Sequence, residues 1–287
     1  MLKKNITIAI PASIISDTPH LREKTAKIGL IGRAAAIFRI NEIIIYADNP
    51  KMDQKYDLSL ISTLLSYMET PQYMRKEIFK LSPDLQYAGI LPPLRTPHHP
   101  SDGNIKNLKP GEFREGYVIK KTKEGLLIDI GLRNPAIMYD KQFASQKRLT
   151  VKITRINNQV EVQIADPDQI TQYWGYEISV EKKSLFTLLQ NRRFDLTIGT
   201  SKFGASIPKT ESLLEKKWKD ANIVLIAFGA PTRGLHQIAK EEGKNLDNIM
   251  DFVLNLIPNQ GTETIRTEEA VLTSLAVLNA TLPPAQN

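Results

Sequence analysis

The chain has 287 residues, of which 38 are Lys or Arg, 31 are Asp or Glu, and none is cysteine. A chain of this length has room for about two domains with real hydrophobic cores. The absence of cysteine excludes disulfides, thiolate zinc sites and a cysteine nucleophile. No apolar run reaches the ~20 residues of a membrane span, and the N-terminus lacks the features of a signal peptide. We therefore expect a soluble, cytoplasmic protein.

The chain begins with the pattern of an α/β domain. Runs of β-branched apolar residues predict strands at 6–10 and 42–47. Apolar residues at helical spacing predict helices at 21–40, 58–68 and 73–79. The segment 91–109 that follows is rich in proline and is typical of a linker.

The middle of the chain changes to short β-type runs. We predict strands at 114–120, 126–130, 149–156 and 160–165. Gly125, Gly131 and the Asn157–Asn158 pair separate these runs as turns. Several short strands in such a small segment predict a small barrel. The OB-fold is the commonest such barrel among those that bind nucleic acid.

Nearly all of the net charge of +7 lies in this middle segment. Residues 105–165 contain 12 basic and 6 acidic residues, whereas the rest of the chain contains 26 and 25. A localised positive surface is expected of a protein that binds the phosphate backbone, although a solvated basic surface would give the same count. The residues that we predict to bind RNA are Arg114, Lys120, Lys121, Lys123, Arg133, Lys147, Arg148, Lys152 and Arg155.

The α/β pattern returns after Asp166. We predict strands at 176–180, 194–198, 222–228 and 252–256, and helices at 181–190, 210–217, 235–242 and 267–278. Alternating strands and helices indicate a mostly parallel sheet that is covered on both faces. We therefore predict one α/β domain, formed by 1–92 and 167–287, that is interrupted by an OB-like β-barrel insertion at 93–166.

Several common sites are missing from the sequence. It has neither a phosphate loop nor the glycine fingerprint of dinucleotide-binding folds, and it lacks the nucleophile elbow of the α/β-hydrolases. Histidine occurs at four positions, and the adjacent His98 and His99 face opposite ways in an extended segment. We therefore expect no metal site.

Polar, glycine-containing segments follow three consecutive predicted strands. They are 199–204, 228–234 and 255–261. In open α/β sheets, ligands bind beyond the carboxyl ends of the strands. Glycines let the backbone approach a ligand closely, although ordinary turns would also use them. Because all three segments end neighbouring strands, we predict one shared ligand site.

At these residues the sequence resembles the SPOUT class of RNA methyltransferases. More narrowly, it resembles the archaeal and eukaryotic family of that class in which an OB-fold is inserted into the SPOUT domain. The most specific stretch runs from Asn259 to Ala270, with the sequence NQGTETIRTEEA. Further similarity lies in FGAPTRG at 228–234, AIPASII at 9–15, RAAAIF at 33–38 and PHH at 97–99. The resemblance covers essentially the whole chain.

The resemblance implies a trefoil-knotted sheet, S-adenosylmethionine as cofactor and a homodimer. The knot does not follow from charge or periodicity, because true knots are too rare to infer in that way. The residues implied to bind the cofactor are Thr200, Ser201, Phe228, Gly229, Gly234, Leu256, Ile257, Pro258, Asn259, Gln260, Gly261, Ile265, Thr267 and Ala270.

Methyl transfer requires alignment of the nucleophile with the methyl group and removal of a proton from the nucleophile. The segment 29–38 is similar to the pattern Asn-x-Gly-x-x-x-Arg-x-Ala-x-x-Phe of SPOUT ribose methyltransferases, with Arg33 at the arginine and Lys27 in place of the asparagine. The resemblance to the inserted-OB family favours uridine N3 of ribosomal RNA over the ribose 2′ oxygen. We predict Arg33 or Arg266 as the activating residue and Glu268 as its orienting partner.

Two other interpretations stay open at this point. One is a non-catalytic RNA-binding or assembly protein that uses the basic barrel. The other is a nucleotide-binding α/β protein, which the missing phosphate loop disfavours. Affinity for S-adenosylmethionine, or its absence, distinguishes both from a methyltransferase.

Overall fold

The computed structural model describes residues 4–100, 103–143 and 147–283. The chain divides into two compact units. The first, the α/β unit, comprises Met1–Met68, Pro83–Pro93 and Tyr176–Asn287; the second, the barrel unit, comprises Glu69–Ser82 and Leu94–Gly175. The barrel unit begins one residue after the start of the predicted insertion at 93, extends past its end at 166 to Gly175, and includes the separate segment Glu69–Ser82.

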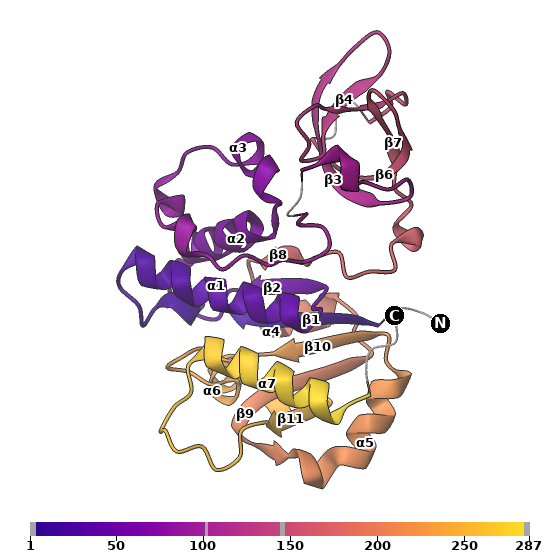
Figure 1. Ribbon diagram of the computed structural model, residues 1–287. Helices are drawn as coiled ribbons and strands as arrows, with labels where there is room; N and C mark the ends of the chain where they lie inside the picture. The colour runs from indigo at the N-terminus through magenta and orange to yellow at the C-terminus, as the bar shows by residue number, and fades with distance from the viewer. Residues whose placement is uncertain (1–3, 101–102, 144–146, 284–287) are drawn as a thin grey trace. The chain divides into compact units, whose positions relative to one another are not determined.

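The α/β unit is built on a parallel six-stranded sheet with the order β11-β9-β10-β1-β2-β8 (Figure 1). Its strands are β1 (Asn5–Pro11), β2 (Glu42–Tyr46), β8 (Glu177–Glu181), β9 (Leu196–Ser206), β10 (Ile223–Ala227) and β11 (Phe252–Asn255). Every neighbouring pair in this sheet is parallel. The predicted mostly parallel sheet is therefore confirmed.

Helices cover both faces of this sheet. They are α1 (Leu21–Ile37), α2 (Lys55–Glu69), α4 (Leu185–Asn191), α5 (Ile207–Asp220), α6 (Leu235–Glu241) and α7 (Thr267–Thr281), with 3₁₀ turns at Ala12–Ile15, Pro83–Leu85, Ala88–Ile90 and Leu246–Asn248 (η7). Ala9, Ile44 and Leu225 pack against α4 and α6. Because strand side chains alternate between faces, the intervening residues, such as Ile8 and Ile43, turn to the other face. Figure 1 shows α1 and α7 crossing that face.

Strand β9 differs from the prediction, which ended the strand at residue 198 and began a loop at 199. It continues to Ser206 because β11 pairs with both of its halves: Val253 lies opposite Gly199, and Leu254 lies opposite Ala205. The register shift leaves residues 200–204 without counterparts on β11. A Cβ at Gly204 would come within 2.6 Å of the Leu254 backbone carbon, so glycine is required there.

The barrel unit contains a closed five-stranded barrel with the order β3-β4-β5-β7-β6. Its strands are β3 (Phe113–Lys121), β4 (Leu126–Asp129), β5 (Ala136–Met138), β6 (Arg148–Ile156) and β7 (Val160–Ile164), and its short helices are Gln72–Met74, α3 (Arg75–Ile78), Ile105–Asn107 and Pro167–Gln169. The predicted barrel is confirmed, as are its four predicted strands. The sequence did not indicate β5, which has three residues and is too short to show a period of two.

A buried polar cluster in the barrel unit centres on Glu69. Its carboxylate accepts two hydrogen bonds from the Arg148 guanidinium, at 2.7 and 2.9 Å. Arg148 Nε donates to Glu115 at 2.6 Å, and Glu115 also accepts from the Trp174 indole at 2.6 Å. Nε2 of His98 lies 3.2 Å from Oε1 of the Glu69 carboxylate. These bonds tie the segment that begins at Glu69 to the barrel.

The cluster lowers the pKa values of two side chains in the barrel unit, Glu69 and His99. Burial raises the pKa of the Glu69 carboxyl, but hydrogen bonds from His98 and Arg148 outweigh it and lower that pKa to about 2. Burial and the neighbouring His98 lower the pKa of His99 to about 4. In the folded protein Glu69 therefore stays ionised, and His99 stays neutral, to lower pH than in the unfolded chain.

Both shifts predict that acid destabilises the barrel unit. The unfolded chain takes up a proton at His99 from about pH 6.5 downwards and at Glu69 from about pH 4.5, whereas the folded protein does so only near pH 4 and pH 2. We expect the melting temperature to fall as the pH decreases from 7 to 4 and to fall further below 4.5. In a domain of this size, each kcal/mol lost corresponds to about 4–8 °C.

The His99→Asn variant removes the contribution of the histidine to that curve. Its melting temperature should depend less on pH between 6.5 and 4, as measured by calorimetry in a pH series. The matched control is His20→Asn, which changes an exposed histidine at the start of α1. An identical pH dependence in the His99 variant and the wild type would contradict this assignment.

Candidate functional site

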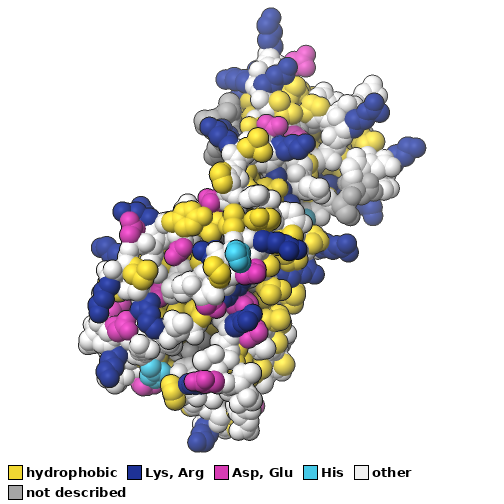
Figure 2. Space-filling view, turned by 90° about the vertical axis from the view of Figure 1, so that its left-hand side faces the viewer, with side chains coloured by type: hydrophobic (Ala, Val, Ile, Leu, Met, Phe, Trp, Pro, Cys, Tyr) yellow, Lys and Arg dark blue, Asp and Glu magenta, His cyan; other side chains and the backbone are white. Residues whose placement is uncertain are grey.

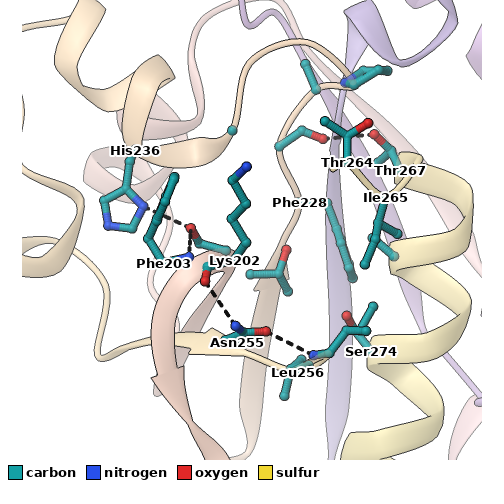
Figure 3. A pocket seen from close by; sticks show the side chains of 18 of the residues that line it. Lys202, Phe203, Phe228, His236, Asn255, Leu256, Thr264, Ile265, Thr267 and Ser274 are labelled. Atoms are coloured by element: carbon teal, nitrogen blue, oxygen red, sulfur yellow. Dashed lines mark hydrogen bonds between the residues drawn. The ribbon is translucent and has the colours of Figure 1, made fainter. Parts of the chain in front are cut away.

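The carboxyl ends of β9, β10 and β11 surround a cavity of about 380 Å³ (Figure 3). Its walls come from residues 200–203 of β9, from the loop 228–234 after β10, from residues 254–257 at the end of β11, and from the start of α7. This is the edge of a parallel sheet at which ligands bind in open α/β folds. The volume is within the range of small-molecule sites.

The cavity brings together most of the residues that the sequence predicted to bind a cofactor. All of them line it except Pro258, Asn259 and Gly261. Further lining residues lie within the predicted segments and the 259–270 motif but were not singled out, namely Lys202, Phe203, Ala230, Pro231, Thr232, Asn255 and Thr264. The sequence missed His236, Gln237, Leu254 and Ser274, which lie outside those segments. Ser274 could have been found from the sequence. It lies four residues after Ala270 and seven after Thr267, both predicted site residues, so the three share one face of the predicted helix.

One wall of the cavity is apolar. Phe228 and Leu256 are buried, and Ile265 is half-buried. Figure 3 shows Phe228 and Ile265 beside α7, with Lys202 between them and His236. No side chain lies within 4 Å of a Cβ placed on Gly234 or Gly261. A flat apolar ligand could therefore lie against this wall, with polar contacts from the backbone.

Hydrogen bonds from outside the loop hold the backbone of 228–234. The Tyr46 hydroxyl donates to the carbonyl of Phe228 at 2.7 Å, and the Thr267 hydroxyl donates to that of Gly229 at 3.1 Å. Burial raises the pKa of the Tyr46 hydroxyl well above its usual value, so it remains a donor. A Cβ on Gly229 would lie 2.9 Å from Leu235 N, which is why the loop closes only with glycine there.

The side chain of Arg233 anchors the far end of this loop. Its guanidinium lies 2.6 Å from Asp48, whose side chain is fully buried, and 2.9 Å from Glu241. Asp48 also accepts hydrogen bonds from Ser13 at 3.0 and 2.6 Å and from Gln54 at 2.9 Å. Asp48 thereby joins the loop after β10 to the segments that follow β1 and β2.

The polar side of the cavity is formed by β9 and β11. Asn255 donates to the carbonyl of Lys202 at 3.0 Å and accepts from Ile257 N at 3.1 Å. The Lys202 ammonium lies over the Phe203 ring, 5.2 Å from its centroid, and 3.4 Å from the carbonyl of Glu263. Lys202 and His236 are the ionisable side chains on the described cavity wall, and no carboxylate lies among its lining residues.

His236 is held between a hydroxyl and a carboxylate. Its Nδ1 lies 3.0 Å from the Ser201 hydroxyl, and its Nε2 lies 3.4 Å from Asp247. The Phe203 ring packs edge-on against the imidazole, with centroids 6.4 Å apart. Ser201 Oγ also accepts a hydrogen bond from Phe203 N at 3.2 Å.

The three predicted catalytic residues are not brought together. Arg266 is exposed at the start of α7, next to the lining residues Ile265 and Thr267. The guanidinium of Arg33 donates to the carbonyl of Pro93 at 2.9 Å, away from the cavity lining. Glu268 is buried beside Lys27, with Nζ at 3.4 Å, instead of facing either arginine. Their catalytic roles stay predictions.

The predicted RNA-binding residues of the barrel fall into two groups. Arg114 and Arg148 are tied to carboxylates, with Arg114 at 2.7 Å from Glu112. Both are therefore engaged within the barrel, and Arg155 also forms an ion pair, at 3.5 Å from Glu161. The exposed members are Lys120, Lys121, Lys123, Arg133, Lys147 and Arg155. Figure 2 shows Lys and Arg side chains projecting from the barrel at the top of the view.

The described residues also bear on two other kinds of site. Groups of three or more His, Asp or Glu side chains that could hold a metal ion do not occur among them. Within the same residues, every helix is too short or too polar to cross a membrane.

Comparisons with known proteins agree over almost the whole chain. A family model described as "Putative RNA methyltransferase" matches residues 5–278. A 28S rRNA (uridine-N(3))-methyltransferase of Drosophila melanogaster is 32% identical over 97% of the chain, which spans 62% of that relative's length. The human enzyme of the same name is 30% identical over 95% of the chain and 77% of its own length.

An archaeal relative aligns with the chain over nearly the full length of both proteins. An uncharacterised protein of Halobacterium salinarum is 30% identical over 96% of the chain and 99% of its own length. The match thus includes the segments that form the cavity and those that form the barrel. The chain belongs to the RNA methyltransferase family that this model describes.

Proposed function

We propose that this chain transfers a methyl group from S-adenosylmethionine to N3 of a uridine in ribosomal RNA. The observation that carries the proposal is the cavity at the carboxyl ends of β9, β10 and β11, in a chain of an RNA methyltransferase family. The names of the Drosophila and human relatives support uridine N3 over the ribose 2′ oxygen. A cytoplasmic location stays a prediction.

The volume and the lining of the cavity suit S-adenosylmethionine. The apolar wall at Phe228, Leu256 and Ile265 suits an adenine ring, and the carbonyls and amides of 228–234 and 256–261 can read its edge. Lys202 would hold the carboxylate of the methionyl part. No carboxylate occurs among the described lining residues, so backbone carbonyls would face the cofactor's positive charges.

The chain's residues would mainly align the reactants and balance charge. Bound S-adenosylmethionine supplies an activated methyl group for in-line displacement. The held loop 228–234 and the Asn255–Lys202 bond fix the cavity walls before the cofactor enters, so that little ordering remains at the reaction step. Arg266, beside the cavity, would stabilise the negative charge that develops on the uracil ring as N3 loses its proton.

The finer fold assignments belong to the same proposal. The barrel order β3-β4-β5-β7-β6 supports an OB-fold, and the loops that converge on one cavity support a SPOUT domain with a trefoil knot. We also propose a homodimer. Leu30, Ile37 and Leu272 on α1 and α7 are 54, 50 and 43% exposed and could be covered by a second copy; a monomeric mass in sedimentation velocity would contradict it.

Calorimetric titration with S-adenosylmethionine tests the cofactor site. We expect the wild type to bind. The Arg233→Met variant removes the ion pair with Asp48 that holds the loop 228–234, so the cofactor must order this loop when it binds. We expect binding to weaken by about tenfold or more, which corresponds to a loss of ~1.4 kcal/mol in binding free energy. The control is Arg192→Met, which removes another guanidinium–carboxylate pair, with Glu42 in the α/β unit. Absence of binding in the wild type would favour a non-catalytic RNA-binding protein.

Charge reversal tests the barrel as the RNA-binding surface. We expect Lys120→Glu, Lys121→Glu and Lys123→Glu together to lower affinity for ribosomal RNA fragments and to flatten its salt dependence by about two units of the log–log slope. The control carries Lys51→Glu, Lys209→Glu and Lys216→Glu, which reverse exposed lysines of the α/β unit. Equal affinity and slope in the barrel variant and the control would show that RNA binds elsewhere.

A further inference from the structure

Removal of the N3 proton needs an acceptor, and the cavity wall offers few. Of its two ionisable side chains, Lys202 directs its Nζ at the Phe203 ring and the carbonyl of Glu263, which is the geometry of a donor. Glu268, an alternative carboxylate from the sequence, is buried against Lys27. Histidine is the residue type that changes its protonation between pH 5 and 8. On the described wall, that residue is His236.

The hydrogen bonds around His236 form a directed chain. Phe203 N donates to Ser201 Oγ at 3.2 Å, so the serine hydroxyl is free to donate in turn to His236 Nδ1 at 3.0 Å. With Nδ1 as acceptor, the neutral ring carries its proton on Nε2, 3.4 Å from the Asp247 carboxylate. Enzymes that activate a weak nucleophile by removing its proton often link a hydroxyl, an acceptor imidazole and an orienting carboxylate in this way.

We propose that Ser201 receives the proton of the target uridine N3 and passes its own hydroxyl proton to His236, which Asp247 orients. This inference rests on the proposed function. In the step, the N–H electron pair remains on N3 and forms the new N–CH₃ bond. The methyl–sulfur bond breaks with both electrons going to sulfur, and the proton ends on His236 Nδ1. The resulting imidazolium faces the Asp247 carboxylate, which stabilises its charge.

The surroundings of the imidazole suit an acceptor. Asp247 approaches it from η7, and the Phe203 ring of β9, which also contacts the Lys202 ammonium, packs against it. On its own helix and the preceding loop, Lys240 is exposed, and the guanidinium of Arg233 is taken up by Asp48 and Glu241. The His236 side chain is 32% exposed, so a proton can return to solvent after each turnover.

The test is single-turnover methylation of ribosomal RNA across a pH series. The wild-type rate should rise with pH over the range in which histidine titrates and then level off. The His236→Asn variant should bind S-adenosylmethionine within a few-fold of the wild type, but its rate at saturating cofactor should fall about 100-fold or more and keep rising above pH 8. The Ser201→Ala variant should lose a similar factor, and the matched control His20→Asn should keep the wild-type profile.

A substrate with a more acidic target nitrogen separates proton removal from a structural role. RNA with 5-fluorouridine at the target position ionises more easily at N3, so it depends less on a base. We expect it to recover most of the rate that His236→Asn loses. A variant rate within twofold of the wild type, or a loss that 5-fluorouridine leaves unchanged, would overturn the proton-acceptor role. Failure of the wild type itself to methylate N3 would instead overturn the proposed function.

Discussion

The parallel pairing of β9 with β10 and β11 is the constraint on which the site depends. Parallel strands end at the same edge of a sheet, so their carboxyl ends meet whatever their separation in sequence. In this chain that edge collects residues 200–203, 228–234 and 254–257, which are distant along the chain. The register shift between β9 and β11 adds the extra residues 200–204, which carry Ser201 and Lys202 to the cavity wall.

Each unit has a buried carboxylate that links segments which hydrophobic packing alone would leave loosely joined. Asp48 ties the loop after β10 to Ser13 and Gln54, and Glu69 ties the segment at the start of the barrel unit to Arg148. Burial of an unpaired carboxylate is costly, so such groups must be fully hydrogen-bonded. They therefore specify one arrangement of the loops around them, which is what a preorganised binding site requires.

Much of the fold could be predicted from the sequence because its signals were local. The periodicity of 21–40 and the apolar runs at 6–10 and 42–47 gave α1, β1 and β2 nearly at their observed bounds. The continuation of β9 beyond residue 198 could not be predicted, because it depends on pairing with a strand about fifty residues away. The strand β5 could not be predicted because its three residues are too few to show a period of two.

The position of the candidate site was predicted, but the side chains that give it its chemistry were predicted only in part. Glycine-containing segments after strands, including the one that contains Lys202, predicted the cavity. His236 gave no signal of its own, because its neighbours are set by tertiary contacts. Arg114 and Arg148 count as positive charge in the sequence, yet the fold uses them in ion pairs. A family-level prediction of an RNA methyltransferase is confirmed by the match over residues 5–278.

Mass mapping of ribosomal RNA tests the central claim most directly. RNA from cells of the source organism that lack this chain would be incubated with the purified protein and S-adenosylmethionine, then digested and sequenced by mass spectrometry. We predict 3-methyluridine at a defined position that is unmodified before the incubation and modified in wild-type cells. Methylation of a ribose or of another base, or no methylation by a protein that binds the cofactor, would contradict the claim.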